Sequence, residues 1–179
     1  MIVSVAILAF VTLQRLGELA LARRNTARLL AEGGVEAGRR HYPLIVALHA
    51  VWLAGLWALA WDRPANLAWL ALFAVLQALR VWVIATLGPR WTTRIIVLPG
   101  APLVRRGPYR LLPHPNYAVV AGEIAVLPLV FGLWGYALAF SLANAAILFV
   151  RIRAEDRALA AAVPGRLSNA TEAASRASA

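Results

Sequence analysis

Two polar stretches, Gly107-Pro-Tyr-Arg-Leu-Leu-Pro-His-Pro-Asn-Tyr117 and Arg151-Ile-Arg-Ala-Glu-Asp156, decide the fold predicted for this chain. About 35 almost wholly apolar residues separate them, the length of a helical hairpin that crosses a bilayer twice at about 1.5 Å per residue. Such a hairpin returns both stretches to the same membrane face. The pattern therefore predicts one polar site, built from both stretches, at one end of a helical bundle.

Composition indicates a membrane protein. The 179 residues are 61% hydrophobic and 15% charged, with a mean hydropathy of +0.70, and soluble domains of this size rarely carry so much apolar surface. The apolar residues also gather in runs of about 20, the length of a membrane-spanning helix. We predict an all-α integral membrane protein with a single domain over residues 1–163 and a flexible tail over 164–179.

Five segments have the length and composition of membrane spans, namely residues 2–22, 43–61, 67–87, 116–133 and 136–152. The first also resembles a secretory signal, because Ala20-Leu21-Ala22 is like a cleavage site. Arg15 and Glu18 favour a retained span instead, since a signal would be neutral there. Residues 88–115 hold so many prolines and glycines that we expect an irregular segment at the interface or folded over the bundle.

The net charge of +10 comes from arginine alone, because the chain has no lysine. Residues 23–41, 88–115 and 151–179 hold five arginines each. With five spans, these segments fall on one side of the membrane, which the positive-inside rule assigns to the cytoplasm. The arginines lie between apolar runs rather than along one solvated face, so we expect no nucleic-acid partner.

The first stretch presents His114 between two prolines, on a stiff backbone just ahead of the fourth predicted span. Asn116 and Glu123 are seven residues apart and share one face of that helix. A carboxylate this deep in a span is costly unless it is paired or faces a wet cavity. An elaborate helix start would explain the prolines, but it would leave Glu123, Tyr109 and Tyr117 without a role.

The last span carries a matching stripe, with Asn144, Leu148, Arg151 and Glu155 on one helix face. Facing stripes on a hairpin predict a pocket with carboxylates, arginines, a histidine and tyrosines at the cytoplasmic end. It suits a cationic, adenosine-sized cofactor better than a metal, because the chain has no cysteine and its histidines show no ligand spacing. His49 stands alone on an apolar span, where histidine is more often a hydrogen-bonded core residue than a catalyst.

Taken together, Gly107-x-Tyr109, His114-Pro115-x-Tyr117, Glu123 and Arg151-Ile-x-x-Glu155 resemble the isoprenylcysteine carboxyl methyltransferase family over about residues 88–160. That family comprises integral membrane enzymes that use S-adenosylmethionine.

Longer strings resemble one bacterial branch of the family, namely residues 91–100, 114–117, 151–155, 23–25 and 41–43. That branch is encoded beside type III polyketide synthases and O-methylates alkylpyrones or alkylresorcinols.

The resemblance implies a set of residues that border S-adenosylmethionine, namely Tyr109, His114, Pro115, Asn116, Tyr117 and Glu155. It also implies catalytic positions nearer the acceptor for Glu123 and Arg151. The family usually has arginine or lysine immediately before the His-Pro pair, where this chain has Pro113. This departure argues against a carboxylate acceptor.

We therefore expect an S-adenosylmethionine-dependent O-methyltransferase in the bacterial inner membrane, with its active site facing the cytoplasm and an alkylpyrone or alkylresorcinol as its lipophilic acceptor. A hydroxyl acceptor must lose a proton, which His114 or Glu123 could take. Two alternatives stay open. One is carboxyl methylation of a prenylated cysteine, and the other is a non-catalytic scaffold or transporter subunit, although inverted repeats typical of transporters are not found in the sequence.

Overall fold

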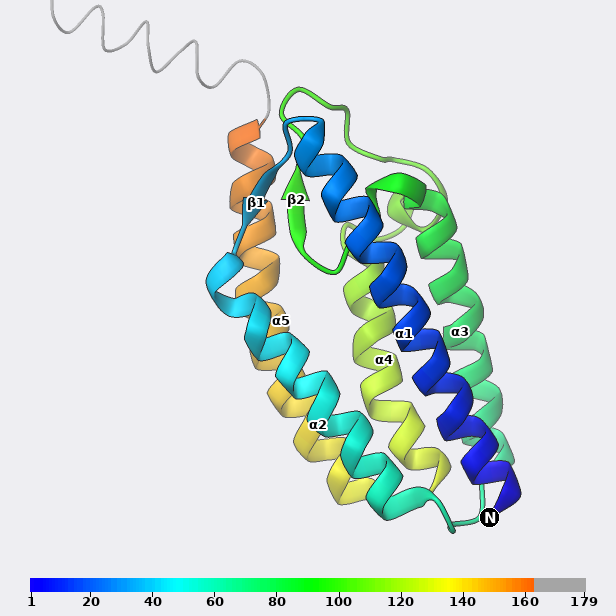
Figure 1. Ribbon diagram of the computed structural model, residues 1–179. Coiled ribbons are helices and arrows are strands. Elements are labelled where there is room, and N and C mark those ends of the chain that lie inside the picture. The colour runs from blue at the N-terminus through cyan, green and yellow to red at the C-terminus, as the bar shows by residue number, and fades with distance from the viewer. Residues whose placement is uncertain (163–179) are drawn as a thin grey trace, which may run out of the picture.

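The computed structural model describes residues 1–162 and is mainly helical (Figure 1). Its five long helices are α1 (Ile2–Ala31), α2 (Tyr42–Ala60), α3 (Leu67–Leu87), α4 (Pro115–Val130) and α5 (Trp134–Ala162). They run alternately in opposite directions, so that the N-terminus and the α2–α3 and α4–α5 connections lie at one end of the bundle (Figure 1). The remaining segments lie at the other end. The predicted flexible tail at 164–179 falls outside the described residues.

Four of the helices, α1, α2, α3 and α5, are long and apolar enough to cross a membrane, which confirms a mainly helical membrane protein. The fourth helix in chain order, α4, is apolar but has only 16 residues. At about 1.5 Å per residue it is about 24 Å long, less than the roughly 30 Å of a bilayer's hydrocarbon core. It runs beside the four candidate spans as a shorter helix.

Two helices continue past their predicted ends. The first predicted span ends at residue 22, but α1 continues through Arg23, Arg24 and Arg28 to Ala31. Helix α5 likewise runs on to Ala162 rather than ending near 152. Hydropathy marks only the part of a helix that lies in lipid, whereas arginine and alanine both favour helix in water as well. The polar ends of these helices therefore project beyond the apolar part of the bundle.

A two-stranded antiparallel sheet covers the end opposite the N-terminus (Figure 1). This sheet was not predicted from the sequence. Strand β1 (Val35–Ala37) pairs with β2 (Ile95–Val97), and Glu36 lies opposite Ile96. Three short 3-10 turns accompany the sheet, namely η1 (Arg39–His41), η2 (Gly88–Arg90) and η3 (Gly107–Arg110). Residues 88–114 thus fold over the bundle end, as expected for so irregular a segment.

The helices supply the contacts that fix this covering segment. Asn25 on α1 donates from Nδ2 to Gly88 O at 3.2 Å and to Trp91 O at 2.8 Å. Gly107 has φ +55° and lies so close to α3 that a Cβ would come within 2.7 Å of Thr86 Oγ1. Only glycine fits such a position. The freed backbone groups therefore find protein partners rather than lipid.

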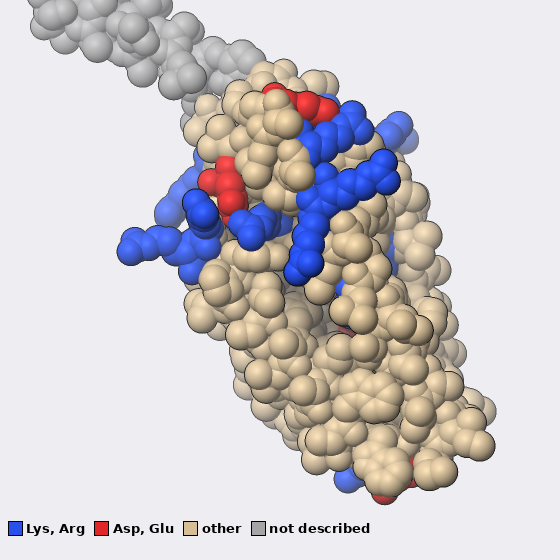
Figure 2. Space-filling view, viewed as in Figure 1, with Lys and Arg blue, Asp and Glu red and all other residues tan. Residues whose placement is uncertain are grey.

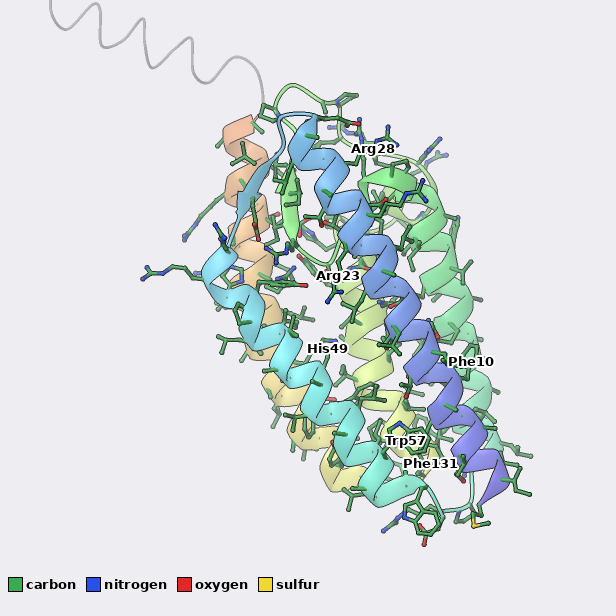
Figure 3. All side chains as sticks on the ribbon, in the orientation of Figure 1. Phe10, Arg23, Arg28, His49, Trp57 and Phe131 are labelled. Atoms are coloured by element: carbon green, nitrogen blue, oxygen red, sulfur yellow. The ribbon has the colours of Figure 1, made fainter. Side chains whose placement is uncertain are left out.

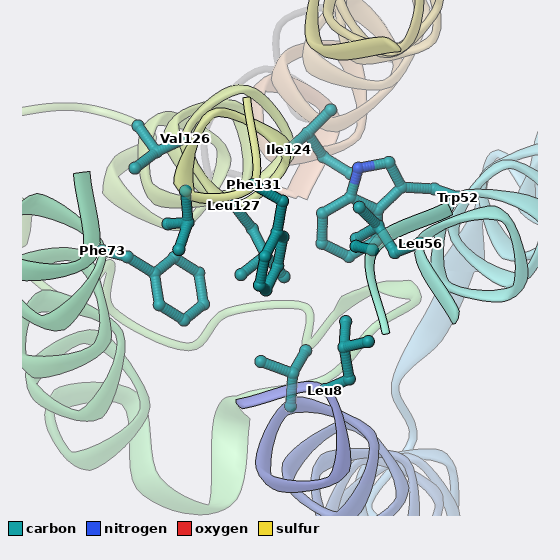
Figure 4. Close-up of a cluster of buried hydrophobic side chains, with 11 residues drawn as sticks. Leu8, Trp52, Leu56, Phe73, Ile124, Val126, Leu127 and Phe131 are labelled. Carbon is teal, nitrogen blue, oxygen red and sulfur yellow. The ribbon is translucent and has the colours of Figure 1, made fainter. Parts of the chain in front are cut away.

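The apolar core fills the half of the bundle nearer the N-terminus, and Figure 4 shows its side chains in close-up. Its buried side chains come from α1 to α4 and the turn that follows, and they include Leu8, Trp52, Leu56, Phe73, Ile124, Leu127 and Phe131. Asn66 caps the start of α3, because its Oδ1 accepts from Ala68 N at 3.0 Å and Trp69 N at 3.2 Å. With that half filled by hydrocarbon, the polar groups gather toward the sheet.

Candidate active site

The two ends of the molecule differ in charge. Arginines gather over the sheet end, whereas the helical surface below them is almost free of charge (Figure 2). Large apolar side chains are exposed along that surface, including Phe10 on α1, Val81 on α3 and Phe149 on α5. Such a surface suits lipid contact. The polar site predicted from the sequence lies at the arginine-rich end.

A polar cavity lies beneath the sheet, between β2, η3, α4 and α5. Tyr109, His114, Asn116, Tyr117 and Glu155 all line it. The fold therefore brings together five of the six residues predicted to border the cofactor, although they come from segments that are up to 46 residues apart in the chain.

Hydrogen bonds and stacking order these side chains. The Tyr117 hydroxyl donates to Glu155 Oε2 at 2.5 Å, and the His114 ring stacks on Tyr117 with centroids 5.6 Å apart. Nε2 of His114 lies 2.9 Å from Asp156 Oδ1. Burial, together with the nearby Glu155 carboxylate, raises the pKa of Tyr109, so its phenol keeps its proton at neutral pH. A carboxylate among aromatic faces fits a cationic nucleoside such as S-adenosylmethionine.

The start of α4 is anchored against the covering segment. Pro115, the sixth predicted cofactor residue, is the first residue of α4, where its missing N–H costs nothing. Pro115 is buried but is not among the residues that line the polar cavity. The Asn116 Oδ1 accepts from Trp91 Nε1 at 3.3 Å. This bond ties the helix start to the buried Trp91 indole.

A second cavity of about 310 Å³, mostly apolar, lies between α1 and α2 next to the polar cavity. Leu16 of α1 and Val46 of α2 line it while being 58% and 43% exposed. The apolar cavity therefore opens toward the lipid-facing surface, where Figure 2 shows a hollow below the arginines. The two helices diverge toward the sheet end (Figure 1), which leaves room for it.

The two cavities share one wall, formed by Trp91, Thr92, Thr93, Asn116, Tyr117 and Arg151. Arg151 is only 4% exposed and donates from Nη2 to Thr93 O at 2.9 Å. Its guanidinium also lies over the Tyr117 ring, 5.9 Å from the centroid. Arg151, one of the two predicted catalytic residues, thus stands where the cavities meet.

Glu123, the other predicted catalytic residue, lies in a buried charge network. It is 1% exposed, and its Oε2 accepts from Arg15 Nη2 at 2.7 Å and from Arg80 Nη1 at 3.0 Å. Its Oε1 accepts from Gln77 Nε2 at 2.8 Å. Arg80 also holds Glu18 through two bonds of 2.5 and 2.6 Å. Two arginines and two glutamates therefore join α1, α3 and α4 inside the bundle.

This network corrects the expectation that Glu123 and Arg151 face one pocket. Neither cavity is lined by Glu123 among residues 1–162, because α1 and α3 supply the cations that the carboxylate requires. Arg15 Nη1 also pairs with Glu18 Oε2 at 2.8 Å. Through its bonds Glu123 holds Arg15 and Arg80 at the wall of the apolar cavity. A catalytic role for Glu123 stays a prediction, and its geometry favours positioning.

Comparison with known sequences identifies the class of protein. A sequence model described as the isoprenylcysteine carboxyl methyltransferase (ICMT) family matches residues 69–161, a stretch that includes η3, α4 and nearly all of α5. The chain belongs to the ICMT family. Members of the ICMT family are membrane methyltransferases that use S-adenosylmethionine, and the matched region contains every residue predicted for the site.

One curated relative of this ICMT-family chain is YpbQ of Bacillus subtilis (strain 168), described as an uncharacterized protein. The two are 40% identical over 158 residues, which cover 86% of this chain and 94% of YpbQ. No solved structure matches the chain. The similarity to YpbQ therefore extends well beyond the residues of the ICMT match.

Several residues that line the two cavities were not predicted from the sequence. Trp91 and Thr93 lie within residues 91–100, which resemble the bacterial branch of the family, so the sequence contained a signal for them. Tyr42 and His49 line the apolar cavity from α2, and His49 was expected to be a core residue. No local pattern distinguishes a cavity-lining histidine from a core one, because the difference depends on the distance between α1 and α2.

Proposed function

We propose that this ICMT-family protein is an S-adenosylmethionine-dependent O-methyltransferase whose acceptor is an alkylresorcinol or alkylpyrone made by a type III polyketide synthase. The observation that carries the proposal is the pair of cavities with a common wall, one polar and one apolar and open toward lipid. Methyl transfer requires donor and acceptor to be aligned with water excluded. At the common wall, the bound cofactor and the bound acceptor would lie next to each other.

The polar cavity would hold the cofactor. Glu155 would bind its ammonium group or ribose hydroxyls, and the Tyr117 hydroxyl, bonded to Glu155 at 2.5 Å, would fix the carboxylate. S-adenosylmethionine supplies a methyl group carried on a positively charged sulfur. Tyr109, as a neutral phenol, can donate a hydrogen bond to an oxygen or nitrogen atom of the cofactor.

The apolar cavity would take the acceptor head group while the alkyl tail stays in lipid between α1 and α2. Arg15 lines this cavity, and within residues 1–162 its buried Nε has no hydrogen-bond partner. A free donor on a cation would stabilise an oxygen that becomes negative. Pro113, in place of the family's usual basic residue, supports a hydroxyl acceptor rather than a carboxylate.

The matching family's description favours a second candidate acceptor, the carboxylate of an isoprenylcysteine. The same apolar cavity would accommodate its prenyl chain. We propose further that the arginine-rich end faces the cytoplasm of a bacterial inner membrane, as the positive-inside rule predicts.

One experiment separates these acceptors. The purified full chain in lipid nanodiscs receives methyl-labelled S-adenosylmethionine with an alkylresorcinol, an alkylpyrone or a farnesylcysteine analogue. Label in a polyketide lipid, lost in Glu155→Gln but retained in Glu32→Gln, is the expected result; Glu32 is an exposed carboxylate paired with Arg28. Label in farnesylcysteine alone would establish the second candidate. Label in none of the three would contradict both.

A further inference from the structure

His49 of α2 lies on the wall of the apolar cavity, facing the space between α2 and α1 (Figure 3). Its Nδ1 lies 2.8 Å from Ile45 O, the only hydrogen bond that its side chain makes within the described part of the chain. A carbonyl oxygen can only accept, so Nδ1 carries the proton. In the neutral ring, Nε2 then has a free lone pair and can accept a proton.

The other titratable or charged groups on this wall are Arg15 and Glu18 of α1, Arg80 of α3, Tyr117 of α4, Arg151 of α5, and Tyr42 of α2 itself. The arginines have no acceptor atoms. Both oxygens of Glu18 already receive hydrogen bonds from Arg80. The Tyr42 hydroxyl lies 3.1 Å from Thr93 Oγ1, and the Tyr117 hydroxyl donates to Glu155. His49 Nε2 is therefore the uncommitted basic atom of the apolar cavity.

Glu123 and His114, the two proton acceptors expected from the sequence, do not line the apolar cavity. Glu123 has both oxygens bonded in the charge network. His114 lines the polar cavity and contacts Asp156, so neither group reaches the apolar cavity of the described structure. An acceptor hydroxyl that enters from lipid would meet His49 instead.

We propose that His49 is the base that takes the proton of the acceptor hydroxyl, and that the acceptor is therefore a weakly acidic phenol or enol rather than a carboxylate. This inference rests on the proposed O-methyltransferase function. In the step, the O–H proton moves to Nε2 while the oxygen bonds to the methyl carbon. The carbon–sulfur bond breaks, and its electron pair stays on sulfur, which becomes neutral.

The two acceptor classes differ in whether they need a base, so a base in the cavity indicates which class of acceptor the site takes. A carboxylate with an ordinary pKa near 4 is already ionised at neutral pH and needs no base. A phenol with an ordinary pKa near 10 is almost wholly protonated and does need one. The nearby Arg15 would stabilise the oxygen as its proton leaves, since Arg15 shares the cavity wall. The combination of His49 and Arg15 thus matches a phenol.

The first test compares wild type with His49→Asn in nanodiscs, using an alkylresorcinol and the more acidic alkyl hydroxypyrone. Asparagine keeps a donor toward Ile45 O but supplies no basic nitrogen. We expect kcat on the resorcinol to fall about 100-fold, the loss to shrink as the pH rises, and kcat on the hydroxypyrone to change less than about threefold. An equal loss on both acceptors at every pH, or no loss, would overturn the inference.

A second readout is independent of turnover. The chain has three histidines, so nitrogen-15 NMR of histidine-labelled protein in lipid gives few resonances, which His41→Asn and His114→Asn assign by elimination. We expect an unprotonated Nε2 on His49 whose shift moves when the alkylresorcinol is added with S-adenosylhomocysteine. A protonated Nε2, or one that the acceptor leaves unchanged, would count against the proposal.

These outcomes distinguish the inference from the function on which it rests. If wild type methylates neither polyketide lipid, the proposed function fails and the role of His49 falls with it. If wild type methylates the resorcinol and His49→Asn does so equally fast, only the role of His49 is overturned. Binding of S-adenosylhomocysteine by His49→Asn within about twofold of wild type shows that the variant is folded, and imidazole added to His49→Ala should restore part of the lost rate.

Discussion

Tyr117 is one of the six residues in the wall between the two cavities. It lines both of them, stacks against His114 and donates its hydroxyl proton to Glu155. A hydrogen bond to a charged group is worth about 1.5–3 kcal/mol. Most of that bond's effect here would be to hold the Glu155 carboxylate in one orientation, so its loss should be visible in cofactor affinity before it is visible in stability.

We therefore expect Tyr117→Phe to raise the Kd for S-adenosylmethionine about tenfold, which corresponds to about 1.4 kcal/mol. Equilibrium binding of the labelled cofactor to nanodisc protein measures this directly. Tyr136→Phe is the matched control, because its hydroxyl donates to Trp52 O at 2.9 Å and Tyr136 is absent from the linings of both cavities. An unchanged Kd for Tyr117→Phe would contradict the assignment of Glu155 to the cofactor site.

Different contacts position α1 and α2, the two helices that supply most of the apolar cavity's lining. The charge network around Glu123 joins α1, α3 and α4, whereas α2 contacts α5 closely at Gly55. A Cβ on Gly55 would lie 2.2 Å from the Tyr136 hydroxyl oxygen. The width of the opening between α1 and α2 thus depends on how closely α2 can approach α5.

Gly55→Ala should destabilise the protein although alanine is the better helix former. Alanine gains about 1 kcal/mol in propensity, but the overpacking against Tyr136 costs about 1–3 kcal/mol. We expect the thermal unfolding midpoint in detergent to fall by about 2–4 °C per net kcal/mol lost. Gly17→Ala on α1 is the control, because no heavy atom lies within 4 Å of its added Cβ, and it should leave the midpoint unchanged or raise it. Equal midpoints for both variants would contradict the contact.

At the scale of the whole molecule, charge and hydrocarbon are separated along the bundle axis (Figure 2). The arginine-rich end carries the sheet and the polar cavity, and the opposite end carries the N-terminus and the short connections (Figure 1). The positive-inside rule counts such juxtamembrane arginines. It therefore predicts the side on which the soluble cofactor enters.

The absence of cysteine from the sequence makes this orientation easy to measure. Asp62→Cys places a thiol at the N-terminal end and Leu103→Cys places one at the arginine-rich end, both at exposed positions. A membrane-impermeant maleimide should label Asp62→Cys in intact cells and Leu103→Cys only after the cells are permeabilised. The reverse pattern would place the polar cavity outside the cytoplasm.

The sequence by itself determined which segments form apolar helices, at which end the polar site lies, and five of the residues that line the polar cavity. Runs of apolar residues, prolines and the spacing of residues on one helix face are local properties of the sequence. They can be identified without knowing which distant segments pack against them. Tyr109, His114, Asn116, Tyr117 and Glu155 were brought together by a hairpin whose geometry follows from its length.

Only the tertiary structure decided where Glu123 and His49 point and where the lipid-facing opening lies. Glu123 is paired with Arg15, which is 108 positions away, and with Arg80, and no local pattern fixes such a choice among several buried cations. His49 lines the cavity where α1 and α2 diverge, and the connection between these helices contains β1, which pairs with a strand about 60 residues away in the chain. Burial and pairing depend on these distant contacts, and so the apolar cavity could not be predicted from the chain alone.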